Sequence, residues 1–225
     1  KAIQALAVAR RAAQEAPDDY KAAYYVAYAL MELGDGAEAQ RHAERSLQLA
    51  PSTEAKAAVQ DLLATLQAVS TLKEADSAAA EGLHAKAGRL YLQVWERGVL
   101  PAQKTIVAAD LFQNRLQDTR TAARLLRDLP TRYAGTPEAD EAAKRLVGLR
   151  SALKAVAEDA LAHARKREPG NAERTRWLQA ALEADPDMQD AHLALANDAA
   201  ESGDWAALEP RLKTLQRKGW LQGQL

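Results

Sequence analysis

The sequence has 225 residues, of which 48% are hydrophobic and only 5% aromatic, and its 30 basic and 31 acidic residues leave a net charge of −1. This balance argues against binding of nucleic acid by bulk electrostatics. No run of about 18 apolar residues is present to span a membrane, and the absence of cysteine excludes disulfides, thiolate metal sites and cysteine nucleophiles. Alanine and leucine dominate the hydrophobic residues, which favours an all-α fold of closely packed helices.

The first 51 residues contain three helical segments separated by turn residues. An alanine-rich helical pattern ends at Pro17, and a helix is predicted over about 21–33, before the turn Gly34-Asp35-Gly36. A second helix is predicted over about 37–49 and ends before Pro51, which lies 34 residues after Pro17. The spacing of these prolines indicates an internal repeat of two helices.

Glycine, proline and polar turn signals divide the rest of the chain into further helices. They are predicted over about 53–81, 83–97, 102–117, 121–133, 137–167, 172–184, 189–201 and 205–217. The segments 53–81 and 137–167 are long, and the pattern leaves open whether each is continuous or broken in the middle. Pro210 leaves open whether the last helix begins at Trp205 or near Glu209.

The segment 20–51 resembles the tetratricopeptide repeat (TPR) family. That family has small residues where helices cross, a Gly-Asp turn, and a proline after the second helix. Here these are Ala27, Ala39 and Ser46, Gly34-Asp35, and Pro51, although Ala23 stands where the family usually has tryptophan. The pattern returns near the other end, with Ala181, Ala196 and Gly203-Asp204. By this resemblance the chain begins in the middle of a repeat.

The resemblance implies a right-handed α-solenoid (superhelix) of helix-turn-helix repeats, in which stacking of units buries their apolar faces. The expected units are 1–17, the second helix of a truncated repeat; 18–51, a TPR repeat; 52–101, a long degenerate unit; 102–136, a degenerate repeat; 137–186, a second long unit; and 187–225, a C-terminal repeat. The middle of the chain departs most from the family pattern.

In TPR proteins the first helix of each pair lines a concave groove that binds partners. Carried over by residue, the groove set of the first repeat is Lys21, Tyr24, Tyr28, Met31 and Glu32, and that of the last is Asp190, Leu193, Asn197 and Glu201. Tyrosine and methionine are common at interface cores, which supports binding of a protein or peptide partner. The alternative is that the aromatic stripe packs on a neighbouring helix. The four tryptophans are expected to pack between helices.

The sequence offers no catalytic or cofactor-binding motif. His42, His84, His163 and His192 are far apart and lack a second metal ligand at helical spacing, and neither a phosphate-binding glycine loop nor a nucleophile elbow is present. Asp18-Asp19, Ser52 and Thr136 stand where helix N-caps belong. We therefore predict a protein that is not an enzyme and that holds no cofactor or metal.

The predicted function is a protein-interaction scaffold, as part of a bacterial multiprotein assembly. A structural spacer or a self-association segment of a larger cell-envelope or polysaccharide-secretion protein is the alternative, which makes a homo-oligomer a further expectation; an enzyme is the third reading. The turn from Tyr133 to Ala139 resembles one found in bacterial cell-envelope TPR proteins, which favours the periplasm over the cytoplasm.

Overall fold

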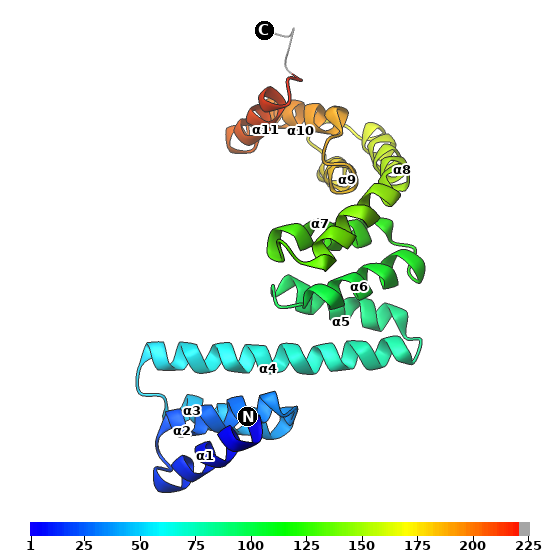
Figure 1. Ribbon diagram of the computed structural model, residues 1–225. Coiled ribbons are helices and arrows are strands. Elements are labelled where there is room, and N and C mark those ends of the chain that lie inside the picture. The colour runs from blue at the N-terminus through cyan, green and yellow to red at the C-terminus, as the bar shows by residue number, and fades with distance from the viewer. Residues whose placement is uncertain (221–225) are drawn as a thin grey trace. The chain divides into compact units, whose positions relative to one another are not determined.

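A computed structural model describes residues 1–220, which form eleven α-helices and no strand (Figure 1). The helices are α1 (Ala2–Glu15), α2 (Tyr20–Glu32), α3 (Gly36–Leu49), α4 (Thr53–Ala80), α5 (His84–Glu96), α6 (Ala102–Asn114), α7 (Thr119–Arg132), α8 (Pro137–Arg165), α9 (Ala172–Ala184), α10 (Gln189–Ser202) and α11 (Trp205–Arg217). The all-α prediction is confirmed, while the right-handed superhelix stays a prediction.

Helix boundaries follow from capping residues and from glycine turns. The side chains of Asp19, Ser52 and Thr136 accept hydrogen bonds from the first turns of α2, α4 and α8, as the sequence predicted. Gly34 and Gly203 follow α2 and α10 with φ angles of +84° and +71°. Only glycine adopts this left-handed conformation without steric cost, so both turns depend on it.

The chain divides into two compact units, Lys1–Leu100 and Pro101–Leu225. In the first unit α2 and α3 pack against one another, and α4 contacts both of them. Val26 and Leu30 of α2 meet Leu62 and Leu66 of α4 in one buried cluster, with alanines at the helix crossings. Each buried leucine or valine contributes about 1.5–3 kcal/mol relative to exposure, so this cluster holds the three helices together.

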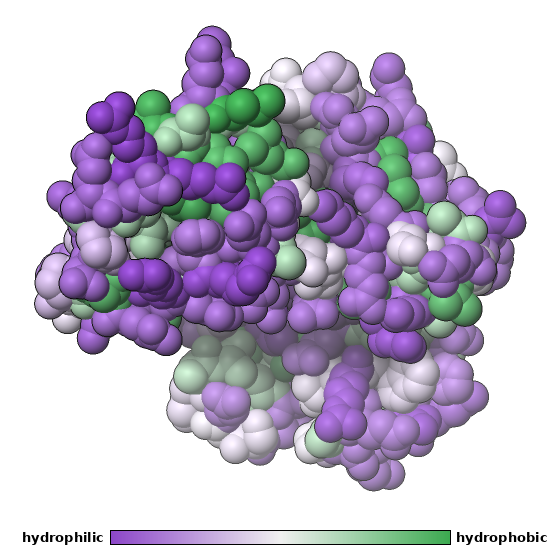
Figure 2. All heavy atoms as spheres, turned by 90° about the horizontal axis from the view of Figure 1, so that it is seen from below, coloured by the Kyte–Doolittle hydropathy of each residue, from purple (hydrophilic) through white to green (hydrophobic). Residues whose placement is uncertain are grey.

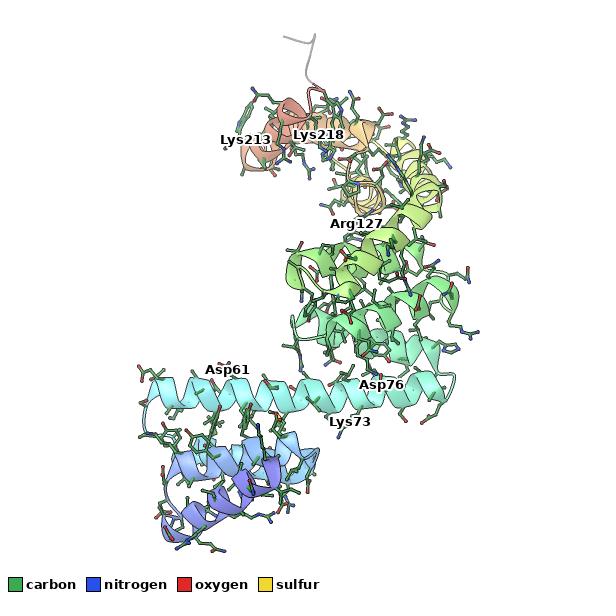
Figure 3. All side chains as sticks on the ribbon, viewed as in Figure 1. Asp61, Lys73, Asp76, Arg127, Lys213 and Lys218 are labelled. Atoms are coloured by element: carbon green, nitrogen blue, oxygen red, sulfur yellow. The ribbon has the colours of Figure 1, made fainter. Side chains whose placement is uncertain are left out.

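The long helix predicted over 53–81 is uninterrupted: α4 (Thr53–Ala80) has 28 residues and a length of about 42 Å. Its first half packs on α2 and α3, and its second half packs on α5 (Figure 1). The hydroxyl of Tyr91 on α5 donates a hydrogen bond of 2.6 Å to Asp76, which lies on the second half of α4 (Figure 3). Because α4 contains neither glycine nor proline, nothing in its sequence breaks the backbone hydrogen-bond ladder.

The second unit repeats this arrangement with another long continuous helix, α8, of 29 residues. It contacts both α6 and α7, and its last turns join α9 and α10 in a buried cluster that includes Leu161, Leu178 and Leu195. Arg127 of α7, labelled in Figure 3, donates hydrogen bonds to the carbonyls of Glu183 and Ala184 at the end of α9. It thereby satisfies acceptors that the helix itself leaves unpaired.

The last helix differs in one respect from the sequence prediction. Trp205 was expected to pack between helices, but it is 72% exposed. The helix begins at this residue, with Pro210 inside it, and buries Leu208 and Leu215 against α10. Trp205 is the first residue of the helix and does not belong to the cluster that Leu208 and Leu215 form with α10. In the part of the chain that the structure covers, no helix is long and apolar enough to cross a membrane.

Candidate functional site

The predicted groove residues of the first repeat lie within about 100° of one another around α2, but they differ in what they contact. Tyr24 and Met31 pack against the buried cluster that joins α2, α3 and α4. Tyr28 and Glu32 point instead to the side of α2 on which α1 lies, and Lys21 is exposed at the start of the helix. Of these five residues Tyr28 and Glu32 line the same hollow, and a partner-binding groove formed by all five stays a prediction.

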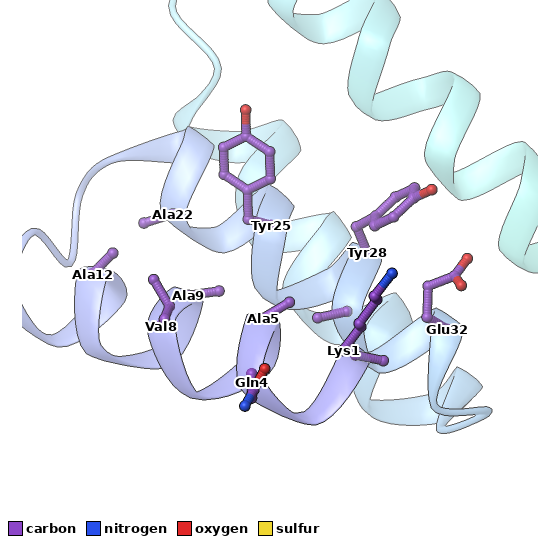
Figure 4. A pocket seen from close by; sticks show the side chains of 12 residues that line it. Lys1, Gln4, Ala5, Val8, Ala9, Ala12, Ala22, Tyr25, Tyr28 and Glu32 are labelled. Atoms are coloured by element: carbon purple, nitrogen blue, oxygen red, sulfur yellow. The ribbon is translucent and has the colours of Figure 1, made fainter.

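Tyr28 and Glu32 line a hollow between α1 and α2 with a volume of about 720 Å³, which we call the α1–α2 hollow (Figure 4). Its α1 side consists mainly of small residues: Ala5, Ala9 and Ala12, with Val8, Gln4 and Lys1 beside them. Its α2 side carries Tyr25 and Tyr28 with Ala22 and Ala29 between them. Lys1 and Glu32 lie at the same end of the hollow (Figure 4).

The α1–α2 hollow exposes large hydrophobic side chains. Val8 is 71% exposed, Tyr25 59% and Tyr28 46%. Figure 2 shows a compact hydrophobic area bordered by hydrophilic residues on the left of the view, where Figure 1 places α1–α3. Tyr25 was not among the predicted groove residues. The spacing of Tyr25, Tyr28 and Glu32 along one helix face, at i, i+3 and i+7, was the available signal.

Three predicted groove residues of the last repeat do lie together. Asp190, Leu193 and Asn197 of α10 line a hollow of about 350 Å³ that is also lined by residues of α8 and α9, and we call it the α8–α10 hollow. Its apolar lining includes Leu161, Ala164, Leu178 and Ala194, and its polar lining includes Arg165 and Arg174. Glu201, the fourth residue of the predicted set, is exposed in the last turn of α10 and does not line it.

Arg174 is held in place by a largely buried ion pair. Its Nε donates to Asp198 over 2.8 Å and its Nη1 donates to the carbonyl of Arg167 over 3.2 Å. Asp198 is only 6% exposed, so the carboxylate fixes the guanidinium. The Nη2 group of Arg174 and the side-chain amide of Asn197 form no hydrogen bond with residues 1–220. Both groups are therefore available to a ligand.

Two further ion pairs border this region. Arg165 pairs with Asp190 over 2.7 Å on the lining of the hollow. Arg167 donates to Glu173 over 2.9 Å, and this hydrogen bond lowers the pKa of the Glu173 carboxyl. The basic residues from Arg165 to Arg167 are thus partly neutralised by acidic neighbours.

The histidines are spread over the chain, and within residues 1–220 no group of three histidine, aspartate or glutamate side chains could hold a metal ion. His163 instead stacks on Trp177, with ring centroids 4.5 Å apart. The Nε2 of His192 donates a hydrogen bond to the carbonyl of Pro186, over 2.9 Å. The polar chemistry of the chain is therefore concentrated in ion pairs and in the two hollows.

No family model matches the chain, and no curated protein matches it. Among solved structures the chain is similar to YrrB, described as a TPR protein with an unusual peptide-binding site. That similarity covers 91% of this chain and 89% of the other at 12% identity, with a TM-score of 0.27.

Proposed function

We propose that the chain is a helical-repeat scaffold that binds an extended segment of a partner protein in the α8–α10 hollow. The observation that carries this proposal is the free pair of polar groups, Arg174 Nη2 and the Asn197 amide, beside an apolar lining. An amide side chain donates and accepts at once, as a peptide backbone requires, and a guanidinium donates to a carbonyl or carboxylate.

The shape and chemistry of the hollow define the class of ligand. Leu193 and Ala194, the partly exposed apolar residues of the lining, offer a surface for one apolar side chain of the partner. The side-chain amide of Asn197 would form hydrogen bonds with the partner's backbone next to that apolar residue. Arg174 would donate a hydrogen bond to a carbonyl or carboxylate further along the partner segment. Because Asp198 holds Arg174 before the partner arrives, little side-chain entropy is lost on binding. The proposed ligand is therefore a peptide with one aliphatic residue, next to which a carbonyl or carboxylate group accepts a hydrogen bond.

Peptides selected from a random displayed library provide the probe, and fluorescence anisotropy of a selected peptide measures its affinity. Asn197→Ala removes two hydrogen bonds and should weaken binding about tenfold, at roughly 1.4 kcal/mol for the pair. Asn197→Asp keeps the shape, removes the donor and should weaken binding similarly. Asn114→Ala, an exposed asparagine at the end of α6, is the matched control and should leave affinity unchanged.

Selected peptides whose affinity is the same for the parent chain and for both Asn197 variants would disprove binding at this hollow. Failure to select any peptide would disprove the peptide-binding function itself. Membership of a bacterial multiprotein assembly stays a prediction of the sequence.

A further inference from the structure

A further hollow, which we call the adjoining hollow, lies next to the α8–α10 hollow. It has a volume of about 430 Å³ and is lined by the second half of α8, the end of α9 and the start of α10. Three residues, Leu161, Arg165 and Asp190, line both hollows. The two hollows are therefore neighbouring parts of one groove between α8 and α10, which we call the joint groove.

The ion pair of Arg165 and Asp190 divides the joint groove. Arg165 belongs to α8 and Asp190 to α10, and the Nη2 group of Arg165 donates to the carboxylate over 2.7 Å. Because each of the two residues lines both hollows, the pair reaches across the groove at the border between them. Leu161, which is only 7% exposed, forms the floor at the same border. Rotation of the two charged side chains therefore joins the hollows.

This ion pair opens at little cost. The side chains of Arg165 and Asp190 are 64% and 60% exposed. Exposed ion pairs favour the paired state by no more than about fivefold. The pair of Arg174 and Asp198 differs, since its side chains are only 16% and 7% exposed. The joint groove thus has one ion pair that is fixed by burial and one that a ligand can displace.

The joint groove has the length of a short extended segment. Its lining runs along α8 from Lys154 to Arg165 and along α10 from Gln189 to Asn197. At a rise of 1.5 Å per residue these stretches of helix are about 16 Å and about 12 Å long. An extended chain advances about 3.3 Å per residue, so about four or five residues fit along the groove.

The charges of the joint groove balance. Its charged lining consists of the cations Lys154, Arg165 and Arg174 and the carboxylates Glu158, Asp185 and Asp190. Three positive and three negative charges leave no net charge, so the groove as a whole attracts neither an acidic nor a basic segment. Recognition then depends on hydrogen bonds, which an uncharged backbone supplies.

The separated ion pair matches the backbone of an extended segment. Such a backbone presents N–H donors and C=O acceptors along both of its edges. Arg165, on the α8 side, donates to a carbonyl, and Asp190, on the α10 side, accepts from an N–H. We propose, building on the proposed function, that the partner segment occupies both hollows. Arg165 and Asp190 then exchange their ion pair for hydrogen bonds to its backbone.

This exchange predicts that affinity for an uncharged segment rises with salt. Salt screens the ion pair of the free chain, whereas an uncharged segment with capped ends has no charge to screen. Separating Arg165 from Asp190 therefore costs less at high salt, and the segment binds more tightly. A segment that added an ion pair to the complex would instead bind more weakly as salt rises.

Fluorescence anisotropy of an uncharged peptide tests the proposal. The peptide is selected from a displayed library of short sequences without charged residues, and both of its ends are capped. Asp190→Asn removes the ion pair but keeps an oxygen that accepts from the backbone. At about 0.01 M salt this variant should bind the peptide about two- to fivefold more tightly than the parent. At about 1 M salt, where the screening length is about 3 Å, the difference should disappear.

Glu209→Gln is the matched control. It breaks an ion pair of 2.6 Å with Lys213 on α11, whose side chains are 69% and 73% exposed and lie outside both linings. This variant should bind the peptide like the parent at both salt concentrations. Far-UV circular dichroism confirms that both variants are helical.

Two results would overturn the proposal. They are an affinity that Asp190→Asn leaves unchanged or lowers at low salt, and an advantage of this variant that is the same at both salt concentrations. In either case weaker binding by Asn197→Ala would still support peptide binding at the α8–α10 hollow. If Asn197→Ala binds like the parent, the proposed function fails, and the ion-pair exchange that depends on it fails as well.

Shortening the peptide one residue at a time from either end provides a second, independent test. A segment across both hollows requires about four or five residues, so shorter peptides should lose affinity. The advantage of Asp190→Asn should vanish for peptides that fill only one hollow. A peptide of only about two or three residues that binds as tightly as the selected one would place the ligand in a single hollow and overturn the proposal.

Discussion

Tyr91→Phe tests how the second half of α4 is joined to α5. The Tyr91 ring is buried, and its hydroxyl donates a hydrogen bond of 2.6 Å to the Asp76 carboxylate. A hydrogen bond to a charged acceptor contributes about 1.5–3 kcal/mol. The phenylalanine variant keeps the ring and its packing, so the free energy of unfolding of the first unit should fall by about this amount at neutral pH.

The same contact predicts that the free energy of unfolding depends on pH in the alkaline range. Burial, and then the hydrogen bond and charge of Asp76, raise the pKa of Tyr91 above its ordinary value of about 10. Between these two pKa values the folded chain holds a proton that the unfolded chain has lost, so stability falls as pH rises. The contribution of Tyr91 is complete below about pH 10 and is smaller by about 1.4 kcal/mol at pH 11. The difference between parent and variant should narrow by that amount.

Urea unfolding at pH 7 and pH 11, followed by far-UV circular dichroism, measures both effects. Tyr25→Phe is the matched control, because the hydroxyl of Tyr25 forms no hydrogen bond with the part of the chain that the structure covers, and it should leave stability unchanged. Equal stability of Tyr91→Phe and the parent at pH 7, or a difference between them that is the same at pH 11, would refute the coupling of Tyr91 to Asp76.

Two further substitutions test the packing and the turns. Leu66→Ala leaves a cavity where α4 meets α2 and α3 and should cost about 2–5 kcal/mol in urea unfolding, whereas Leu33→Ala, at an exposed position, should cost less than about 1 kcal/mol. Gly203→Ala forces a side chain into the left-handed turn between α10 and α11 and should cost about 1–2 kcal/mol. Unchanged unfolding midpoints would contradict these assignments.

The helices could be predicted because the information that defines them is local. Capping by Asp19, Ser52 and Thr136, and the glycine turns after α2 and α10, depend on residues within a few positions of each helix end. The spacing of hydrophobic residues and the positions of the prolines indicated the remaining helices and their ends. The continuity of α4 stayed open because alanine-rich sequence supports both a long helix and two shorter ones, and the contacts that decide between them come from distant residues.

The orientation of the aromatic stripe could not be predicted from the sequence. Tyr24, Tyr25 and Tyr28 are adjacent on α2, and each could face a groove, a neighbouring helix or solvent. Packing of α3 and α4 on α2 places the partly buried Tyr24 against their hydrophobic cluster, and packing of α1 leaves Tyr25 and Tyr28 at the hollow. In the last repeat three residues of the predicted groove set, Asp190, Leu193 and Asn197, line one hollow. They do so because α8 and α9 both pack beside α10.

The long helices explain how neighbouring parts of each unit depend on one another. In α4 the residues that pack on α2 and α3 and the residue that binds Tyr91 belong to one hydrogen-bonded helix. In ordinary repeat arrays each interface contributes separately to stability. When one helix takes part in two interfaces, one interface can separate alone only if the helix unfolds at a point between the two. Forming the helix again then requires a new nucleation step, which is costly. The two contacts of α4 therefore stabilise one another, although no side chain connects them directly.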